Sequence, residues 1–217
     1  MGGMIPLADA SRRPERFPVI TAAIIVVNVV VFALELMGGE AFVKQWAAIP
    51  ADIAAGRHWI TILTAMFMHG GWMHIMGNMV FLWAFGPEVE DAMGRLRYLA
   101  FYLLSGLAAS VALIATTPGS TVPTLGASGA IAGVMGAFLI TYPGDRIKAL
   151  LVFGWFVRVT LIPAALLIGL WFLFQIFNQI GAVADVQSGG VAYMAHVGGF
   201  IFGAVTARIF ETSGPRR

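Results

Sequence analysis

The run Val19–Met37, VITAAIIVVNVVVFALELM, decides the fold class of this sequence. It contains no charged residue before Glu35, and about 20 consecutive apolar residues in a helix are enough to cross the hydrocarbon core of a bilayer. Arg12, Arg13 and Arg16 precede the run, as in a signal peptide. The run is long for that role, however, and no Ala-x-Ala cleavage pattern follows it. We therefore interpret it as an uncleaved first membrane span.

Further apolar runs follow the first one along the chain. They are long and uninterrupted, whereas the strands of a membrane barrel alternate apolar and polar residues over about 10 positions. The sequence therefore predicts an all-α polytopic membrane protein with a six-helix bundle. The remaining predicted spans are Gly71–Gly86, Leu96–Ala115, the short Ala127–Tyr142, Leu161–Ile180 after an apolar approach from Ala149, and Val191–Phe210.

The composition of the whole chain agrees with this fold class. Of 217 residues, 59% are apolar and only 11% are charged, with a mean hydropathy of +0.85. A soluble protein carries about 25% charged residues, so this chain could not cover a water-facing surface. The net charge of +2, without a basic stripe, predicts no nucleic-acid partner. The absence of cysteine excludes disulfides, thiolate metal sites and a cysteine nucleophile.

The lysine and arginine residues predict the orientation in the membrane. With six spans and an internal N-terminus, eleven of them lie inside and only Lys44 and Arg57 lie outside, as the positive-inside rule requires. We therefore expect both termini to be cytoplasmic. The expected organisation is a short N-terminal tail at 1–17, a six-helix domain at 18–211 and a C-terminal tail at 212–217.

Four polar residues occupy positions where polar groups are costly, namely His74, Asn78, Ser128 and His196. The second, fourth and sixth spans all run from outside to inside, and each of these residues comes early in its span. At 1.5 Å per residue, all four lie within roughly 10 Å of the outer ends of their helices. His74 and Asn78 are four positions apart, so they share one helix face.

Small residues at spacings of three and four form a stripe along two of these spans, which allows close approach of helix backbones. If the two stripes face each other, Ser128 and His196 come together. Taken singly, a stripe can serve packing only, a serine can bond to its own helix, and a histidine can bond across helices. Because the four polar residues lie at one depth and can face one another, we favour a functional site over these separate structural roles. The stripes are Gly129, Gly133, Gly136 and Ala137, and His196, Gly199, Gly203 and Ala207.

These groups predict nucleophilic chemistry. A serine hydroxyl needs a base to become a nucleophile, and His196 is the only histidine on the facing stripe. The oxyanion that develops needs hydrogen-bond donors. The side chains of His74 and Asn78 are candidates, as is the backbone N–H of Ser128, because the first amides of a helix lack intrahelical partners.

Two alternatives to a Ser/His dyad are disfavoured. We expect no carboxylate at this depth, because Asp185 falls in an outer loop and Glu90 and Asp91 fall inside, so a triad is not supported. Zinc is the rival ligand for the histidines, but His69 and His74 are five apart and no acidic ligand joins them. We therefore expect neither a metal nor another cofactor.

Three segments resemble the motifs of the rhomboid intramembrane serine proteases, in that family's order. HGGWMHIMGN at 69–78 resembles HxxxxHxxxN, GASG at 126–129 resembles GxSG, and AHVGGFIFG at 195–203 resembles AHxxGxxxG. The resemblance covers about residues 18–210. Jointly the motifs are highly specific, although GxSG alone would be weak.

The resemblance implies roles for individual residues. Ser128 would be the nucleophile, His196 the general base, and His74, Asn78 and the Ser128 amide the oxyanion hole. The site would lie in a water-filled cavity open to the outside, with the fifth helix and the outer loop about 181–190 controlling entry. The supporting positions would be Gly126, Gly129, His69, Gly199 and Gly203.

The resemblance also implies substrates and a location. The substrates would be transmembrane proteins, cleaved within the bilayer near its outer face, and the compact six-span form is similar to members in the bacterial inner membrane. The oligomeric state stays open. The alternatives are a non-catalytic binder or chaperone of membrane segments, and a transporter or channel. A transport path would need polar groups through the full thickness of the membrane.

The connection Gly38–Gly70 is too long for a simple turn and predicts helices at the outer interface, with Trp46 and Trp59 at headgroup level.

Two positions depart from the family pattern, one in this connection and one after the serine. Many family members carry Trp-Arg in this loop, whereas Ile60 follows Trp59 here. Some members also have an aromatic residue four positions after the serine, stacked on the histidine. That position is Ala132, which leaves open what orients His196.

Overall fold

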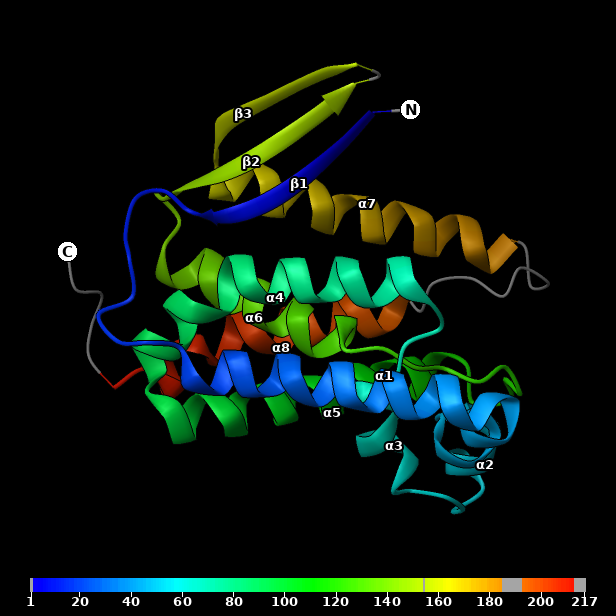
Figure 1. Cartoon of the computed structure of the whole chain (residues 1–217). Coiled ribbons are helices and arrows are strands. Elements are labelled where there is room, and N and C mark those ends of the chain that lie inside the picture. The colour runs from blue at the N-terminus through cyan, green and yellow to red at the C-terminus, as the bar shows by residue number, and fades with distance from the viewer. Residues whose placement is uncertain (1, 154, 185–192, 213–217) are drawn as a thin grey trace.

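The computed structural model describes residues 2–153, 155–184 and 193–212, which are mostly helical (Figure 1). The long helices of this described part follow the order of the predicted spans, and each contains most of one of them, which confirms the six-helix architecture. By length and composition, α1, α5 and α8 are long and apolar enough to cross a membrane. The helices are α1 (Val19–Trp46), α4 (Trp72–Met93), α5 (Arg95–Thr116), α6 (Ser128–Thr141), α7 (Ala164–Ala184) and α8 (Tyr193–Phe210).

The connection between α1 and α4 is folded into short helices. They are α2 (Pro50–Ala54), α3 (Thr61–Thr64) and the 3-10 helix η1 (Ala65–Phe67). Gly39 breaks the helical geometry of α1 with a φ of +57°, two residues after the predicted end of the first span. The apolar run therefore ends where a backbone conformation that favours glycine bends the chain.

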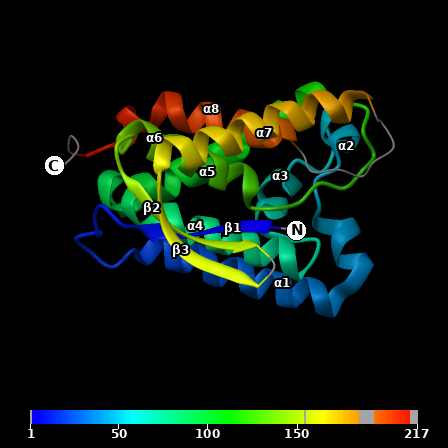
Figure 2. The same cartoon turned by 90° about the horizontal axis from the view of Figure 1, so that it is seen from above.

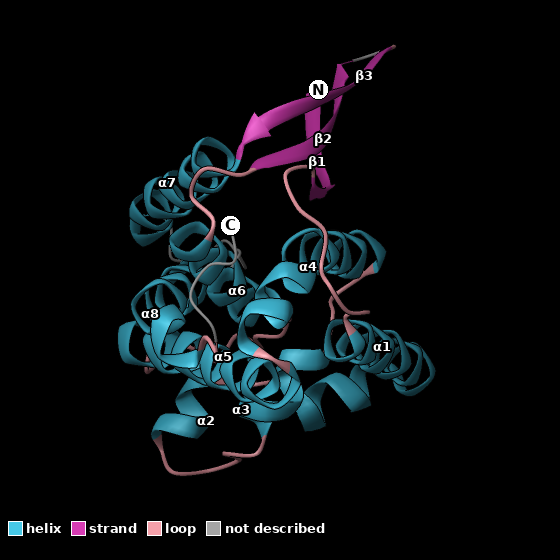
Figure 3. Cartoon of the chain, turned by 90° about the vertical axis from the view of Figure 1, so that its left-hand side faces the viewer, coloured by secondary structure: helices cyan, strands magenta, loops and turns pink. Residues whose placement is uncertain are grey.

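A three-stranded antiparallel sheet is an addition to the predicted fold. It has the order β1-β2-β3 and lies to one side of the bundle, beside α4 and α7 (Figure 3). We expected an N-terminal tail at 1–17 and an apolar approach from Ala149 to the fifth span. These segments instead contribute β1 (Gly2–Asp9), β2 (Arg146–Phe153) and β3 (Phe156–Pro163).

The N-terminal segment is fixed to the bundle just after β1. The guanidinium of Arg12 pairs with the carboxylate of Asp145, and it lies 3.9 Å from the ring centroid of Tyr142. Both partners belong to the turn that connects α6 to β2. The cation–π contact with Tyr142 and the two hydrogen bonds from Arg12 to the Asp145 carboxylate hold the end of β1 against this turn.

Helix α6 forms the centre of the bundle (Figure 2). Every residue from Gly129 to Phe138 is buried, as expected for a helix that is apolar on all faces. Its most extensive packing is against α8, and it also contacts α4, α5 and α7. The mutual position of α6 and α8 therefore decides which side chains meet at their outer ends.

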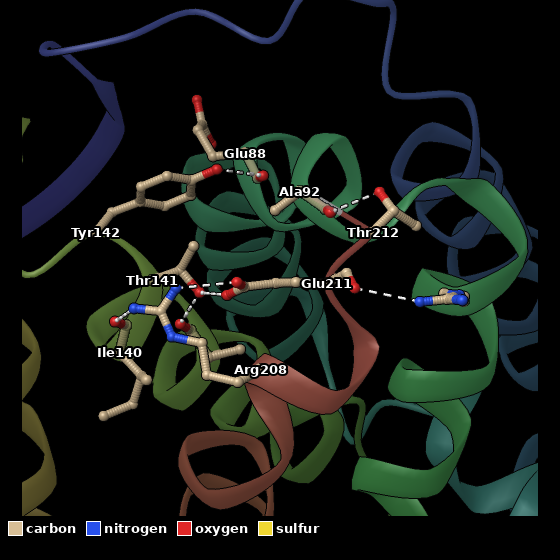
Figure 4. Close-up of polar contacts among 10 residues, drawn as sticks. Glu88, Ala92, Ile140, Thr141, Tyr142, Arg208, Glu211 and Thr212 are labelled. Carbon is tan, nitrogen blue, oxygen red and sulfur yellow. Dashed lines mark hydrogen bonds and ion pairs between the residues drawn. The ribbon is translucent and has the colours of Figure 1, made fainter. Parts of the chain in front are cut away.

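The C-terminal ends of α6 and α8 are joined by polar contacts (Figure 4). Arg208 donates a hydrogen bond from Nη2 to the carbonyl oxygen of Ile140 at 2.8 Å and forms an ion pair with Glu211 at 2.9 Å. The hydroxyl of Thr141 donates to the Glu211 carboxylate at 2.7 Å. These contacts fix the axial register of the two helices at the end opposite to Ser128.

Candidate active site

Ser128 and His196 meet where the N-terminal ends of α6 and α8 lie side by side. Ser128 is the first residue of α6, and His196 lies in the first turn of α8. The distance between Ser128 Oγ and His196 Nε2 is 2.7 Å, and His196 is buried. A serine hydroxyl within hydrogen-bond distance of an imidazole nitrogen is the geometry that proton transfer from an attacking nucleophile requires.

The glycine stripes of α6 and α8 bring these two side chains together. A Cβ atom on Gly199 would overlap with the carbonyl oxygen of Gly129, and one on Gly203 would overlap with the carbonyl oxygen of Gly133. On α6, a Cβ atom on Gly136 would in turn overlap with the Phe200 carbonyl. The two backbones are therefore in direct contact over two helical turns, which only residues without a side chain allow.

Gly126 and His74 lie next to the serine. Gly126 has a φ of +134°, and a Cβ atom there would lie 2.9 Å from His74 Nε2 and 3.6 Å from Ser128 Oγ. The backbone N–H of Gly70 donates to His74 Nδ1 at 3.3 Å. The neutral His74 ring then carries its proton on Nε2, so its free N–H lies beside Gly126 and Ser128.

Asn78 follows His74 by one turn of α4, and His69 precedes this helix. Asn78 is buried, and its side-chain Nδ2 has no partner among the described residues. The His69 ring contacts that of His74 edge-on, with 5.1 Å between the centroids. Burial lowers the pKa of His69 to about 4, and the neighbouring His74 acts in the same direction, so His69 is neutral at pH 7.

The expectation that no carboxylate lies at this depth is wrong for one residue. Glu35, one turn before the break of α1 at Gly39, is buried and accepts a hydrogen bond from the backbone N–H of His69 at 3.0 Å. This hydrogen bond holds the loop in front of α4 in place. It does not orient His196, whose Nδ1 atom has another hydrogen-bond partner. Among the described residues, the hydrogen-bond partners of His196 are thus Ser128 and an uncharged side chain, not a carboxylate.

The partner of His196 is a residue that the sequence analysis did not select. Gln175 Oε1 lies 2.7 Å from His196 Nδ1, and the Trp171 ring lies 5.8 Å from the imidazole, centroid to centroid. Both come from α7. A polar residue inside an apolar span was the criterion that selected the histidines, and it applies equally to Gln175. Asn178 and Gln179 lie nearby in the sequence, so no single polar residue was conspicuous.

Two further sequence expectations concern ligands and the outer loop. Over residues 2–153, 155–184 and 193–212, no group of three or more His, Asp or Glu side chains is arranged to hold a metal ion. Asp185 and most of the loop about 181–190 lie outside the described residues.

Comparison with known proteins identifies the family. The family model described as "Rhomboid domain" matches residues 56–212. The chain is 32% identical to "Rhomboid protease GluP" of Bacillus subtilis (strain 168) over 179 residues, which cover 81% of this chain and 31% of that protein. It is 29% identical to "Rhomboid protein 1, mitochondrial" of Saccharomyces cerevisiae over 195 residues, which cover 84% of this chain and 51% of that protein.

The chain is also similar to a human protein. "Presenilin-associated rhomboid-like protein, mitochondrial" of Homo sapiens is 26% identical over 193 residues, which cover 83% of this chain and 45% of that protein. The chain thus spans about a third of the bacterial relative and about half of the two mitochondrial ones. The matched domain covers well over half of the chain and includes every residue of the candidate site. The chain is an integral membrane protein and belongs to the rhomboid family.

Proposed function

We propose that this protein is an intramembrane serine endopeptidase that cleaves transmembrane segments near the outer face of the bilayer. The observation that carries the proposal is the 2.7 Å contact between Ser128 Oγ and His196 Nε2 at the outer end of the bundle. Family membership supports a protease-type function, since one relative is named a rhomboid protease. The polar groups of this site lie near the outer ends of α4, α6 and α8, which supports a cut near that face.

In the proposed reaction, Ser128 Oγ attacks the carbonyl carbon of the scissile peptide bond while His196 Nε2 takes the hydroxyl proton. The C–N bond then breaks, His196 returns the proton to the leaving amine, and an acyl-enzyme ester remains on Ser128. Water attacks this ester with His196 again acting as the base, which releases the new carboxyl terminus and restores the serine.

The oxyanion of the tetrahedral intermediate would be stabilised by three donors. The Nε2–H of His74 is directed toward Gly126 and Ser128, as the hydrogen bond from Gly70 supports. The Nδ2 atom of Asn78 is buried without a protein partner among the described residues, so its N–H groups are not already committed to another acceptor. The backbone N–H of Ser128 is the first of α6, where amides lack intrahelical acceptors.

The setting of this activity is also part of the proposal. The charge distribution supports cytoplasmic segments at 1–17 and 212–217 around a domain at 18–211, with Gly2–Asp9 of the first segment paired into the sheet as β1. The similarity to compact six-span members supports the inner membrane of a bacterium. The partners are transmembrane substrates and the bilayer. Neither a cofactor nor a nucleic acid takes part.

A serine-directed probe tests the proposal as a whole. The purified protein in proteoliposomes is incubated with a fluorophosphonate, and the adduct is mapped by mass spectrometry. In parallel, cleavage of a single-span substrate is measured. We expect one adduct, on Ser128, and a loss of cleavage in proportion to labelling. Substrate binding without any product would instead favour the non-catalytic binder, and solute flux unaffected by labelling would favour a transporter.

Replacing Asn78 by alanine tests the oxyanion hole. We expect kcat to fall about 100-fold, because one oxyanion-hole donor typically contributes a factor of 10²–10³, while KM changes little. Met76→Ala is the matched control, since Met76 lies on the same helix and is 55% exposed. A kcat within twofold of wild type for Asn78→Ala would remove Asn78 from the proposed oxyanion hole.

A further inference from the structure

Gln175 is a buried amide in α7, and the residues of α7 before it are all apolar. It is 5% exposed, whereas its neighbour Leu173 is 49% exposed. Trp171 lies four residues earlier and therefore shares a face with Gln175. This face packs against α8, where Phe172 also stacks on Phe200 with 4.1 Å between the ring centroids. Gln175 is thus anchored by the packing of the preceding turn of α7 against α8.

Hydrogen bonds determine which end of the Gln175 amide faces the histidine. Its nitrogen donates to the carbonyl oxygen of Trp171 at 3.4 Å, so the oxygen is the atom that lies 2.7 Å from His196 Nδ1. An amide oxygen can only accept, and Nδ1 of His196 must therefore carry the proton. The lone pair of the neutral ring is then on Nε2, which faces Ser128 Oγ.

We propose that Gln175 is a positioning residue that holds His196 in the tautomer and orientation required of the general base. This proposal rests on the proposed function of Ser128 and His196. In serine proteases with a triad, a carboxylate holds the histidine in this way. Here an amide provides the same acceptor, and the Trp171 ring limits the rotation of the imidazole. The two residues answer the question that Ala132 left open.

An amide suits this position better than a carboxylate would. A charged group within a membrane helix is costly unless it is paired, whereas an amide oxygen is an acceptor without net charge. The groups around His196 are otherwise nearly uncharged. Among the described residues, α5 presents Ala109 and Ala112 toward the adjoining turn of α8. The titratable ring of His74, from α4, lies beside Gly126 and Ser128, the latter being the hydrogen-bond partner of His196.

The position of Gln175 also links the base to α7. Ser128 and His196 belong to α6 and α8, whose backbones are in contact, but the acceptor for Nδ1 belongs to a third helix. A displacement of α7 away from α8 would therefore leave the dyad in place and remove the group that selects its tautomer. Full activity then requires α7 to be docked on α8.

Variants of Gln175 in proteoliposomes test the proposal through kinetics. For Gln175→Ala we expect kcat to fall about 10- to 100-fold, with KM within twofold of wild type. General-base catalysis contributes a factor of about 10²–10⁴ to the rate. Part of this factor would be lost, because only some of the His196 rings would hold the required tautomer. For Gln175→Glu we expect partial recovery of kcat and a displacement of the acid limb of the pH–rate profile to higher pH. A carboxylate near Nδ1 favours the protonated ring. Leu173→Ala is the control and should match wild type.

A spectroscopic measurement separates positioning from a merely structural role. In protein labelled with ¹⁵N-histidine, His196 should show the Nδ1–H tautomer in wild type and a mixture of tautomers in Gln175→Ala. The chain has four histidines, and a His196→Asn sample assigns the resonances. Unchanged tautomers would overturn the proposal.

The outcomes also distinguish this proposal from the proposed function. If Ser128→Ala is inactive while Gln175→Ala keeps the wild-type kcat and pH profile, Gln175 has no positioning role and the dyad stands. If Ser128→Ala is fully active, the proposed function itself fails. Should Gln175→Ala not fold, Gln175→Glu decides: a folded variant without the displaced acid limb contradicts the proposal.

Discussion

Replacing either Ser128 or His196 by alanine is expected to lower kcat for cleavage of a transmembrane substrate by about 10⁴-fold or more, because each side chain is ineffective without the other. Ser128→Ala removes the atom that forms the acyl-enzyme, and His196→Ala leaves the hydroxyl without a base at 2.7 Å. Substrate binding should persist in both variants, since neither change alters the packing of α6 on α8. The measurement is single-turnover cleavage in proteoliposomes, with binding followed separately.

The double variant makes this prediction sharper. Because the two residues act as a unit, Ser128→Ala combined with His196→Ala should be no slower than the slower single variant, within about tenfold. Independent contributions would instead multiply. Ser105→Ala is the matched control, because Ser105 is a buried serine of α5 whose hydroxyl has no partner among the described residues. Wild-type cleavage by Ser128→Ala would show that another residue is the nucleophile.

The sequence predicted the helical part of the fold because each span is specified locally. A run such as Val19–Met37 needs no distant partner to become a membrane helix, since all its backbone hydrogen bonds are internal. The glycine spacing in α6 and α8 was informative for a related reason. A stripe of small residues on a membrane helix indicates close packing against the backbone of another helix. The stripes do face each other, through Gly129 with Gly199 and Gly133 with Gly203.

The sheet could not be predicted in the same way. Residues Arg146–Phe153 read as an apolar approach to a span, and their partner in the sheet is Gly2–Asp9, which is far away in the sequence. Pairing between such distant segments leaves no periodic trace in either one. The N-terminal segment is short and contains Pro6, so it gave no reason to expect a strand.

The candidate site was predictable where the chemistry is carried by rare polar residues in apolar helices. His74, Asn78, Ser128 and His196 satisfy this criterion, and their roles stay predictions until variants are measured. Glu35 and Gln175 were missed because their importance depends on contacts between helices. Glu35 falls near the end of the predicted span Val19–Met37, and Gln175 is one amide among several in its span. Only the packing of α1 and α7 gives these two side chains their partners.

Replacing Gly203 by valine is expected to abolish both the stability of the bundle and its activity. A Cβ atom at this position would overlap with the carbonyl oxygen, carbonyl carbon and Cα of Gly133. These are backbone atoms of a buried helix that cannot rotate away, so α6 and α8 must separate. Overpacking a core costs about 1–3 kcal/mol even where side chains can adjust. With a rigid backbone opposite, we expect a loss of at least about 3 kcal/mol in the free energy of unfolding.

The milder substitution Gly203→Ala separates the loss of activity from a general loss of folding. Its single methyl group still meets the Gly133 backbone, and the same contact surface holds Ser128 against His196 two turns further out. A separation of the helices by about 1 Å would stretch the Ser128–His196 hydrogen bond beyond the range in which it is effective. Gly203→Ala should therefore lose fluorophosphonate labelling of Ser128 while it still unfolds cooperatively in detergent. Gly169→Ala is the control, because a Cβ atom at Gly169 meets no atom within 4 Å and alanine favours a helix. If Gly203→Ala keeps wild-type labelling, contact between the glycine stripes is not what positions the dyad.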